Sequence, residues 1–180
     1  MKNPKQKFRN KLGSIHKFNL AGFSFAVKTT KDEQKIREHI HEAYVGTKSI
    51  NNMLKYIPNF AYNFGLYRKG DTFNVVTEYI QGETLNNYIS SKNFKFDEYL
   101  FIMMQIALAI QMAQNICGLV HYDLAPWNIV LQRLDKHISF YYLINHKKVI
   151  RVKTNIVPVI IDYGKSHVIH NNEHHGFVKM

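Results

Sequence analysis

The chain has 180 residues, a formal net charge of +11 and a sequence pI near 9.6. Its single cysteine excludes an intramolecular disulfide and a multi-cysteine zinc site, which favours a reducing, intracellular compartment. A hydrophobic content of 46% is sufficient for a sizeable core, and a single domain over 1–180 is predicted. The longest apolar run, 99–110, is shorter than the roughly 20 residues of a membrane span, so no membrane span is expected.

The basic residues are concentrated at the N-terminus and again between residues 133 and 153. Such clusters attract acidic proteins, anionic lipid or nucleic acid through sequence-independent forces. A solubilising surface is the leading interpretation, and an acidic partner is the alternative. Nucleic acid is disfavoured, though still open, because no signature of a nucleic-acid-binding module accompanies the charges.

The first half of the chain is predicted to be rich in strands. Strands are expected over 14–20 and 23–29, joined at Ala21-Gly22, because glycine accepts the positive φ of a tight turn. A helix is expected within 31–53, where apolar residues recur at helical spacing. Two further strands, 62–67 and 73–79, flank a turn at 68–71.

The second half is predicted to begin with helices. A short helix over 84–90 precedes a longer one, capped by Asp97 and running to about Asn115. Strands are then expected at 129–131, 139–145, 149–153 and 156–161, with residues 139–153 forming an inserted hairpin. The first part of the chain is therefore expected to form a sheet with one helix, and the second part is expected to start with helices.

The segment from His121 to Asn128 carries the strongest chemical signal. It reads His-Tyr-Asp-Leu-Ala-Pro-Trp-Asn and places an acid and an amide five residues apart. Downstream, the apolar strand 157–161 leads into Asp162-Tyr163-Gly164. A base, an amide and a second acid beside a glycine are the groups that metal-assisted transfer of a nucleotide phosphoryl group requires.

In this order the motifs resemble those of the protein kinase family, in particular the divergent kinase-like proteins of large DNA viruses. The run Phe25-Ala26-Val27-Lys28 is similar to the family's strand lysine motif, and Thr77-Glu78-Tyr79-Ile80 to its gatekeeper and hinge. The resemblance implies an α+β, two-lobed fold. An N-lobe over 1–80 would hold an antiparallel sheet and one helix, and a partial C-lobe over 81–180 would start with helices, with the domain truncated at both ends.

The resemblance also implies a binding site for ATP. Lys28 would hold the α- and β-phosphates, positioned by an ion pair to Glu42, with Glu38 one helical turn away as the alternative. The backbone of Glu78 and Ile80 would bind adenine, and Ala26 would pack on the ring.

Catalytic and metal-binding roles follow from the same resemblance. Asp123 would orient and deprotonate the attacking hydroxyl group. Asn128 and Asp162 would ligate Mg²⁺, which favours hard oxygen ligands. Asn128 is therefore assigned both a catalytic and a metal-binding role. His121 would support the loop rather than act as a base.

The chain departs from the family pattern around these residues. Tyr122 replaces the usual arginine, so pairing with a phosphorylated activation segment is not expected. Ala125 and Trp127 replace the positive charges that would offset the γ-phosphate, a role left to Lys165 or to a substrate. No G-x-G-x-x-G precedes Lys28, and residues 1–12 are not expected to form a first strand with a phosphate loop.

The expected activity is ATP- and Mg²⁺-dependent phosphoryl transfer, foremost serine/threonine phosphorylation of a protein substrate with hydroxyl side chains. The expected location is intracellular, in the cytoplasm of a host cell or in a virion. A pseudokinase or kinase fragment that binds nucleotide or partners stays open, as does a small-molecule phosphotransferase. A zinc site among four histidines of the last 14 residues is disfavoured.

Overall fold

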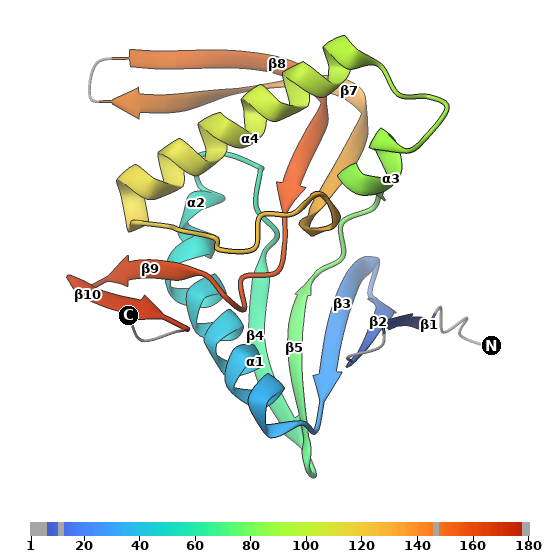
Figure 1. Cartoon of the computed structure of the whole chain (residues 1–180), viewed down its shortest axis with the longest axis vertical. Coiled ribbons are helices and arrows are strands. Elements are labelled where there is room, and N and C mark those ends of the chain that lie inside the picture. Colours follow the sequence, from blue (N-terminus) through green and yellow to red (C-terminus); the bar gives the residue numbers. More distant parts are fainter. Residues whose placement is uncertain (1–6, 11–12, 146–147, 178–180) are drawn as a thin grey trace.

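The computed structural model describes residues 7–10, 13–145 and 148–177. Its first part is a five-stranded antiparallel sheet in the order β1-β2-β3-β5-β4. The strands are β1 (Lys7–Asn10), β2 (Gly13–Leu20), β3 (Phe23–Thr30), β4 (Asn63–Lys69) and β5 (Thr72–Glu78). The sheet lies below the helix-rich second part in Figure 1, as an N-lobe below a C-lobe. The α+β, two-lobed prediction is confirmed.

The tight turn between β2 and β3 agrees with the prediction from the sequence, but the first strand does not. Ala21 and Gly22 have φ angles of 50° and 84° at the tight turn between β2 and β3, as predicted. No first strand with a phosphate loop was expected within residues 1–12. The part about the strand was wrong, because β1 pairs with β2 from Lys7 opposite His16 to Asn10 opposite Gly13. The part about the loop falls on residues 11–12, which lie outside the described residues. This strand forms through backbone pairing with β2, and a short polar strand has no clear pattern of hydrophobic residues by which it could be predicted.

One helical run covers the sheet beside β4 and β5. It comprises α1 (Glu33–Val45), the π-helical turn η1 (Gly46–Ile50) and α2 (Asn51–Met53). Asp32 caps α1, since its carboxylate accepts hydrogen bonds from the backbone of Gln34 and Lys35. At Gly46 a Cβ would collide with the side chain of Asn63, so a glycine is required for this close approach to β4.

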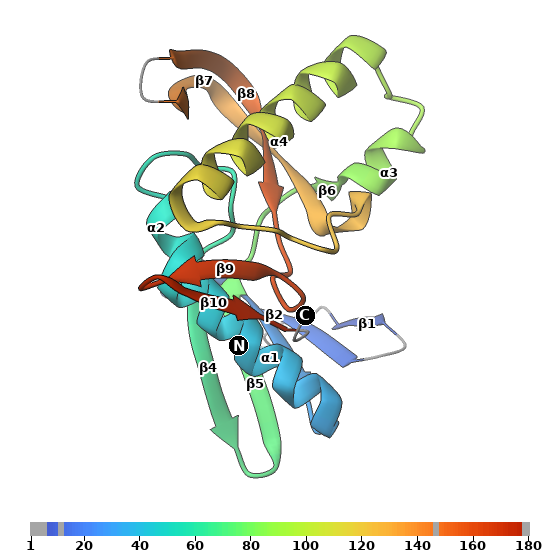
Figure 2. The same cartoon turned by 60° about the vertical axis from the view of Figure 1, so that its left-hand side comes forward.

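The second part combines two helices with a three-stranded sheet in the order β6-β7-β8. Its elements are β6 (Glu83–Thr84), α3 (Leu85–Ile89), α4 (Phe96–Cys117), the 3-10 turn η2 (Pro126–Asn128), β7 (Ile129–Asn145) and β8 (Lys148–Ile160). A terminal hairpin, β9 (His167–His170) and β10 (Glu173–Gly176), lies beside the helical run that starts with α1 (Figures 1 and 2).

The long helix α4 begins earlier and ends later than predicted. Lys95 occupies the N-cap position without a side-chain hydrogen bond, so Asp97 lies in the first turn and is not the cap. Gly118, with a φ of 60°, ends the helix in the left-handed conformation that glycine adopts at low cost.

By length and composition alone, the 22 residues of α4 could cross a membrane. Burial in the protein core accounts for part of this apolar character, since seven residues of the helix are buried there: Ile102, Gln105, Ile106, Ala109, Met112, Ala113 and Cys117. Core helices of this kind pass the same test as membrane spans, so the helix is weak evidence for a membrane.

Two long strands replace the four short ones predicted between residues 129 and 161. β7 and β8 pair continuously apart from irregular register near Arg133–Ile138 and Leu143–Asn145. The inward face of this hairpin, with Phe140, Tyr142 and Val152, joins the same buried cluster as α4. Asn115 on α4 donates to the carbonyl of Ile144, so the hairpin and helix are joined by polar contacts as well.

Candidate active site

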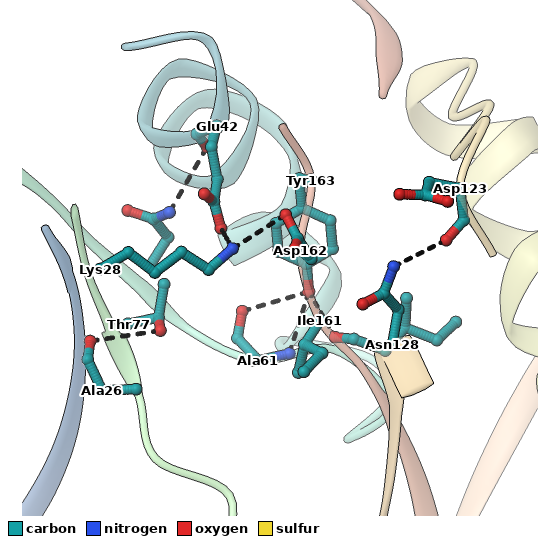
Figure 3. Close-up of polar contacts among 12 residues, drawn as sticks. Ala26, Lys28, Glu42, Ala61, Thr77, Asp123, Asn128, Ile161, Asp162 and Tyr163 are labelled. Atoms are coloured by element: carbon teal, nitrogen blue, oxygen red, sulfur yellow. Dashed lines mark hydrogen bonds and ion pairs between the residues drawn. The ribbon is translucent and has the colours of Figure 1, made fainter. Parts of the chain in front are cut away.

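Lys28 lies at the centre of a three-residue ionic cluster. Its Nζ is 2.7 Å from Oε1 of Glu42 and 2.8 Å from Oδ1 of Asp162. Strand β3, helix α1 and the segment after β8 each contribute one of these residues, as Figure 3 shows. Three segments far apart in the sequence therefore meet at one ammonium group.

The structure distinguishes between the two carboxylates considered for the ion pair. Glu42 is 1% exposed and contacts Lys28 directly. Glu38, one turn earlier, packs against Gly164, where an added Cβ would lie 2.7 Å from its Cγ. The glycine after Tyr163 thus leaves room for α1, and α1 in turn directs Glu42 to Lys28.

The pKa shifts in this cluster favour an ionised Asp162. Burial alone would lower the pKa of Lys28, but attraction to Glu42 and Asp162 raises it above its usual value. Burial would raise the pKa of Asp162, but Lys28 and a backbone hydrogen bond from Gly164 hold it below its usual value. For Glu42, burial prevails and the pKa is raised. Lys28 is therefore cationic at neutral pH, and Asp162 is an anionic oxygen donor.

Asp162 has a φ of 68°, in the left-handed region that residues other than glycine adopt uncommonly, although aspartate does so more readily than most. The following residue, Tyr163, is 1% exposed and holds this turn in place. Its hydroxyl accepts a hydrogen bond from the amide of Ala61 at 3.0 Å and donates to the carbonyl of Ile160 at 2.7 Å. The sequence analysis did not identify this anchoring role of the Tyr163 hydroxyl. A tyrosine directly after a buried strand was a signal that could have indicated it.

The loop from His121 to Asn128 faces Asp162 from the other side. Nδ2 of Asn128 donates to the backbone carbonyl of Asp123 at 2.9 Å, and its Oδ1 points away from Asp123, towards the side where Asp162 lies (Figure 3). The amide of Ile161 donates to the carbonyl of Asn128 at 3.0 Å. Asn128 and Asp162 are therefore held side by side by the β7–β8 ladder.

His121 is 4% exposed, and its Nε2 donates to the carbonyl of Ile161 at 3.2 Å. Burial lowers its pKa, which favours the neutral ring. Its position between the loop and the end of β8 agrees with support of the loop, the role expected for it.

A cavity of about 150 Å³ lies between the sheet and the second part. It is about ten times the ~15 Å³ that a water molecule needs, so it is large enough for a ligand. Lys28 and Asp162 line it together with Ala26, Glu78 and Ile80. All the residues assigned to ATP binding thus border one space, while their individual roles stay predictions.

One further ion pair lies at Asp123. Nζ of Lys165 is 3.1 Å from Oδ2 of Asp123. The predicted loop positions Ala125 and Trp127 carry no charge, and spacing alone could not show which cation reaches Asp123. The contact comes from the turn after Gly164.

The donor set fits magnesium better than zinc. Asp162 and Asn128 offer a carboxylate and an amide oxygen, the hard ligands that Mg²⁺ combines with substrate phosphates. Among residues 7–10, 13–145 and 148–177 no group of three or more histidine, cysteine or acidic residues could hold a metal ion. His167 and His174 contact each other at 3.1 Å as a pair only.

Comparisons with known proteins agree with this geometry. The protein kinase domain model matches residues 13–179. Uncharacterized protein 179R of Invertebrate iridescent virus 6 is 39% identical over 177 residues, which are 91% of this chain and 15% of that protein. Probable kinase 098L of Invertebrate iridescent virus 3 is 32% identical over 162 residues, 89% of this chain and 30% of that protein.

A crystal structure of a kinase domain superposes with a TM-score of 0.63 at 20% sequence identity. It covers 94% of this chain and 52% of the other. The chain spans between 15% and 30% of the length of the two viral relatives described above. The match of the domain model over nearly the whole chain, together with these viral relatives, shows that the chain belongs to the protein kinase domain family.

Proposed function

We propose that this domain transfers the γ-phosphoryl group of ATP to a protein hydroxyl group, foremost on serine or threonine, in a Mg²⁺-dependent reaction inside the cell. The observation that supports it best is the contact of Lys28 with both Glu42 and Asp162. It combines a phosphate-binding cation and a metal-binding carboxylate at one end of a ligand-sized cavity.

Each residue contributes a separate part of the chemistry. Lys28 binds the α- and β-phosphates as a point charge, and Glu42 holds its ammonium in place. Asp162 and Asn128 would hold Mg²⁺, which neutralises the charge on the β- and γ-phosphates when it is bound. The cavity wall formed by Ala26 and the Glu78–Ile80 segment would hold the adenine ring.

Transfer itself requires a base beside the acceptor. The substrate hydroxyl oxygen forms a bond to the γ-phosphorus, and its proton moves to the carboxylate of Asp123. The bond between the γ-phosphorus and the β,γ-bridging oxygen breaks, and ADP leaves with that oxygen. Asp123 suits this step because its side chain is 35% exposed, so a substrate can reach it.

Binding and transfer can be separated by two variants. We expect Asp162→Asn to lose Mg²⁺-dependent ATP binding, because it removes the charged metal ligand. We expect Asp123→Asn to bind ATP normally and to lower transfer to myelin basic protein by about 100-fold or more, the range of general-base catalysis. Calorimetry with MgATP and a radiolabelled transfer assay measure the two quantities.

The same assay tests the alternatives. Absence of nucleotide binding in the parent protein would contradict the proposal, and binding without transfer to any acceptor would indicate a pseudokinase. Transfer to choline or an aminoglycoside, but not to protein, would identify a small-molecule phosphotransferase.

A further inference from the structure

Lys165 occupies a fixed position opposite Asp123. It lies in the turn closed by the hydrogen bond from the amide of Ser166 to the carbonyl of Tyr163 at 3.0 Å. Downstream, His167 and Val120 exchange two backbone hydrogen bonds of 2.8 and 2.9 Å. Both ends of the turn are thereby attached to buried structure, on the Tyr163 side and beside the loop, and the side chain projects to Asp123.

The contact has little value as a stabilising ion pair. The Lys165 side chain is 53% exposed and that of Asp123 is 35% exposed. Exposed pairs of this kind contribute little to stability, because solvent screens the charges and two flexible side chains are ordered. Fold stability therefore gives no sufficient reason for a lysine at this position.

The site has a chemical need for a cation here. Lys28 is engaged by Glu42 and Asp162 on the far side of the cluster, and Ala125 and Trp127 carry no charge in the loop itself. Charge on the transferred phosphoryl group and on Asp123 must nevertheless be balanced where the acceptor approaches. A lysine is suited to both tasks, since its flexible stem lets one ammonium contact two neighbouring anions.

We propose that Lys165 is a catalytic residue of this domain, which takes over from the loop the task of contacting the γ-phosphoryl group and holding Asp123 in orientation. The inference rests on the proposed phosphotransferase function and deepens it. In this chain the positive charge beside Asp123 comes from the segment that follows Gly164 and not from the loop.

The first test removes the charge. We expect Lys165→Ala to lower kcat by about 100-fold, as loss of one stabilising donor at a developing charge does. Affinity for MgATP should fall about 3- to 10-fold and affinity for MgADP should not change, because a charge-assisted contact to the γ-phosphate is lost. Lys153→Ala, which removes an exposed lysine of β8, is the matched control and should retain full activity.

The second test moves the charge back. In Lys165→Ala, the additional change Ala125→Lys places a lysine two residues after Asp123, and we expect kcat to recover by about 10-fold or more. A merely structural salt bridge would not give this rescue. Thermal unfolding of every variant shows whether the domain is folded.

The outcomes separate the two proposals. If the parent protein binds and transfers but Lys165→Ala keeps kcat within twofold, the role of Lys165 is refuted and the proposed function stands. If the parent neither binds MgATP nor transfers phosphate, the proposed function fails and the role of Lys165 fails with it.

Discussion

At the scale of single residues, the most consequential side chain outside the ionic cluster is Tyr163. Its ring is buried between the sheet and the end of β8, and its hydroxyl contacts the backbone of Ala61 and Ile160. The neighbouring Asp162 pays a conformational cost for its φ of 68°. The anchored tyrosine is thus what holds a strained metal-ligand candidate in one conformation.

Replacement of Tyr163 by phenylalanine isolates the hydroxyl. We expect Tyr163→Phe to lower the free energy of unfolding by about 1–3 kcal/mol, because buried polar partners lose their hydrogen bonds. Urea denaturation measures this loss. The exposed Tyr141→Phe is the control, with an expected change within about 0.5 kcal/mol; equal midpoints for the two variants would contradict the argument.

At the scale of elements, α1 carries a titratable side chain whose protonation is linked to folding. His39 lies one turn before Glu42 on this helix, and its Nδ1 is buried without a hydrogen-bond partner. Burial, followed by repulsion from Lys28, lowers the pKa of His39 from 6.5 to about 4. Between pH 6.5 and about 4, the native helix therefore carries a neutral histidine that is protonated in the unfolded chain.

This difference sets a pH dependence with a definite sign. A group whose native pKa is depressed from 6.5 to about 4 lets the unfolded state bind more protons between these values, so stability falls as the pH falls. After allowance for solvent screening, we expect His39 to account for a loss of about 1–2 kcal/mol between pH 7.5 and pH 4.5.

Urea denaturation at several pH values tests this contribution. His39→Gln should be less sensitive to acid than the parent protein by that amount, whereas the exposed His137→Gln should follow the parent. Parallel pH curves for His39→Gln and the parent would show that His39 is not the responsible group.

The positions of the site residues on these elements show which parts of the site the sequence can predict. Motif order was enough to assign Lys28 and Asp162 to one nucleotide site, because Lys28 lies in one strand and Asp162 follows another with a clear apolar pattern. The direct contact between the two residues was not predicted. Helical spacing could not show whether Glu38 or Glu42 pairs with Lys28, since one turn separates them. The packing of Glu38 against Gly164 determines that Glu42 is the partner. The Lys165 contact depends on the shape of a turn, which residue spacing does not encode.

At the scale of the whole molecule, Asn59 connects parts that are distant in the sequence. It is fully buried, accepts from the hydroxyl of Tyr142 at 2.8 Å and donates to the carbonyl of Pro158 at 3.0 Å. Its own carbonyl accepts from the amide of Ile160 at 2.8 Å. The segment before β4 is thus joined to both strands of the β7–β8 hairpin.

Loss of this side chain should weaken the entire fold. We expect Asn59→Ala to lower the free energy of unfolding by about 2–4 kcal/mol, since it leaves a buried hydroxyl and a buried carbonyl without partners. The exposed Asn93→Ala is the matched control. Urea denaturation followed by fluorescence and by circular dichroism should give coincident transitions; an unchanged midpoint for Asn59→Ala would refute this role.

The continuous β7–β8 ladder has a consequence for how relatives of this domain can vary. Ile129 pairs with Ile160 at the base of the hairpin, directly beside Asn128 and Asp162. The separation of these two residues is therefore set by the pairing of the two strands and not by the length of chain between them. Insertions and deletions towards the outer end of the hairpin change its reach but leave that separation intact. The hairpin can diversify during evolution while the candidate metal ligands keep their positions.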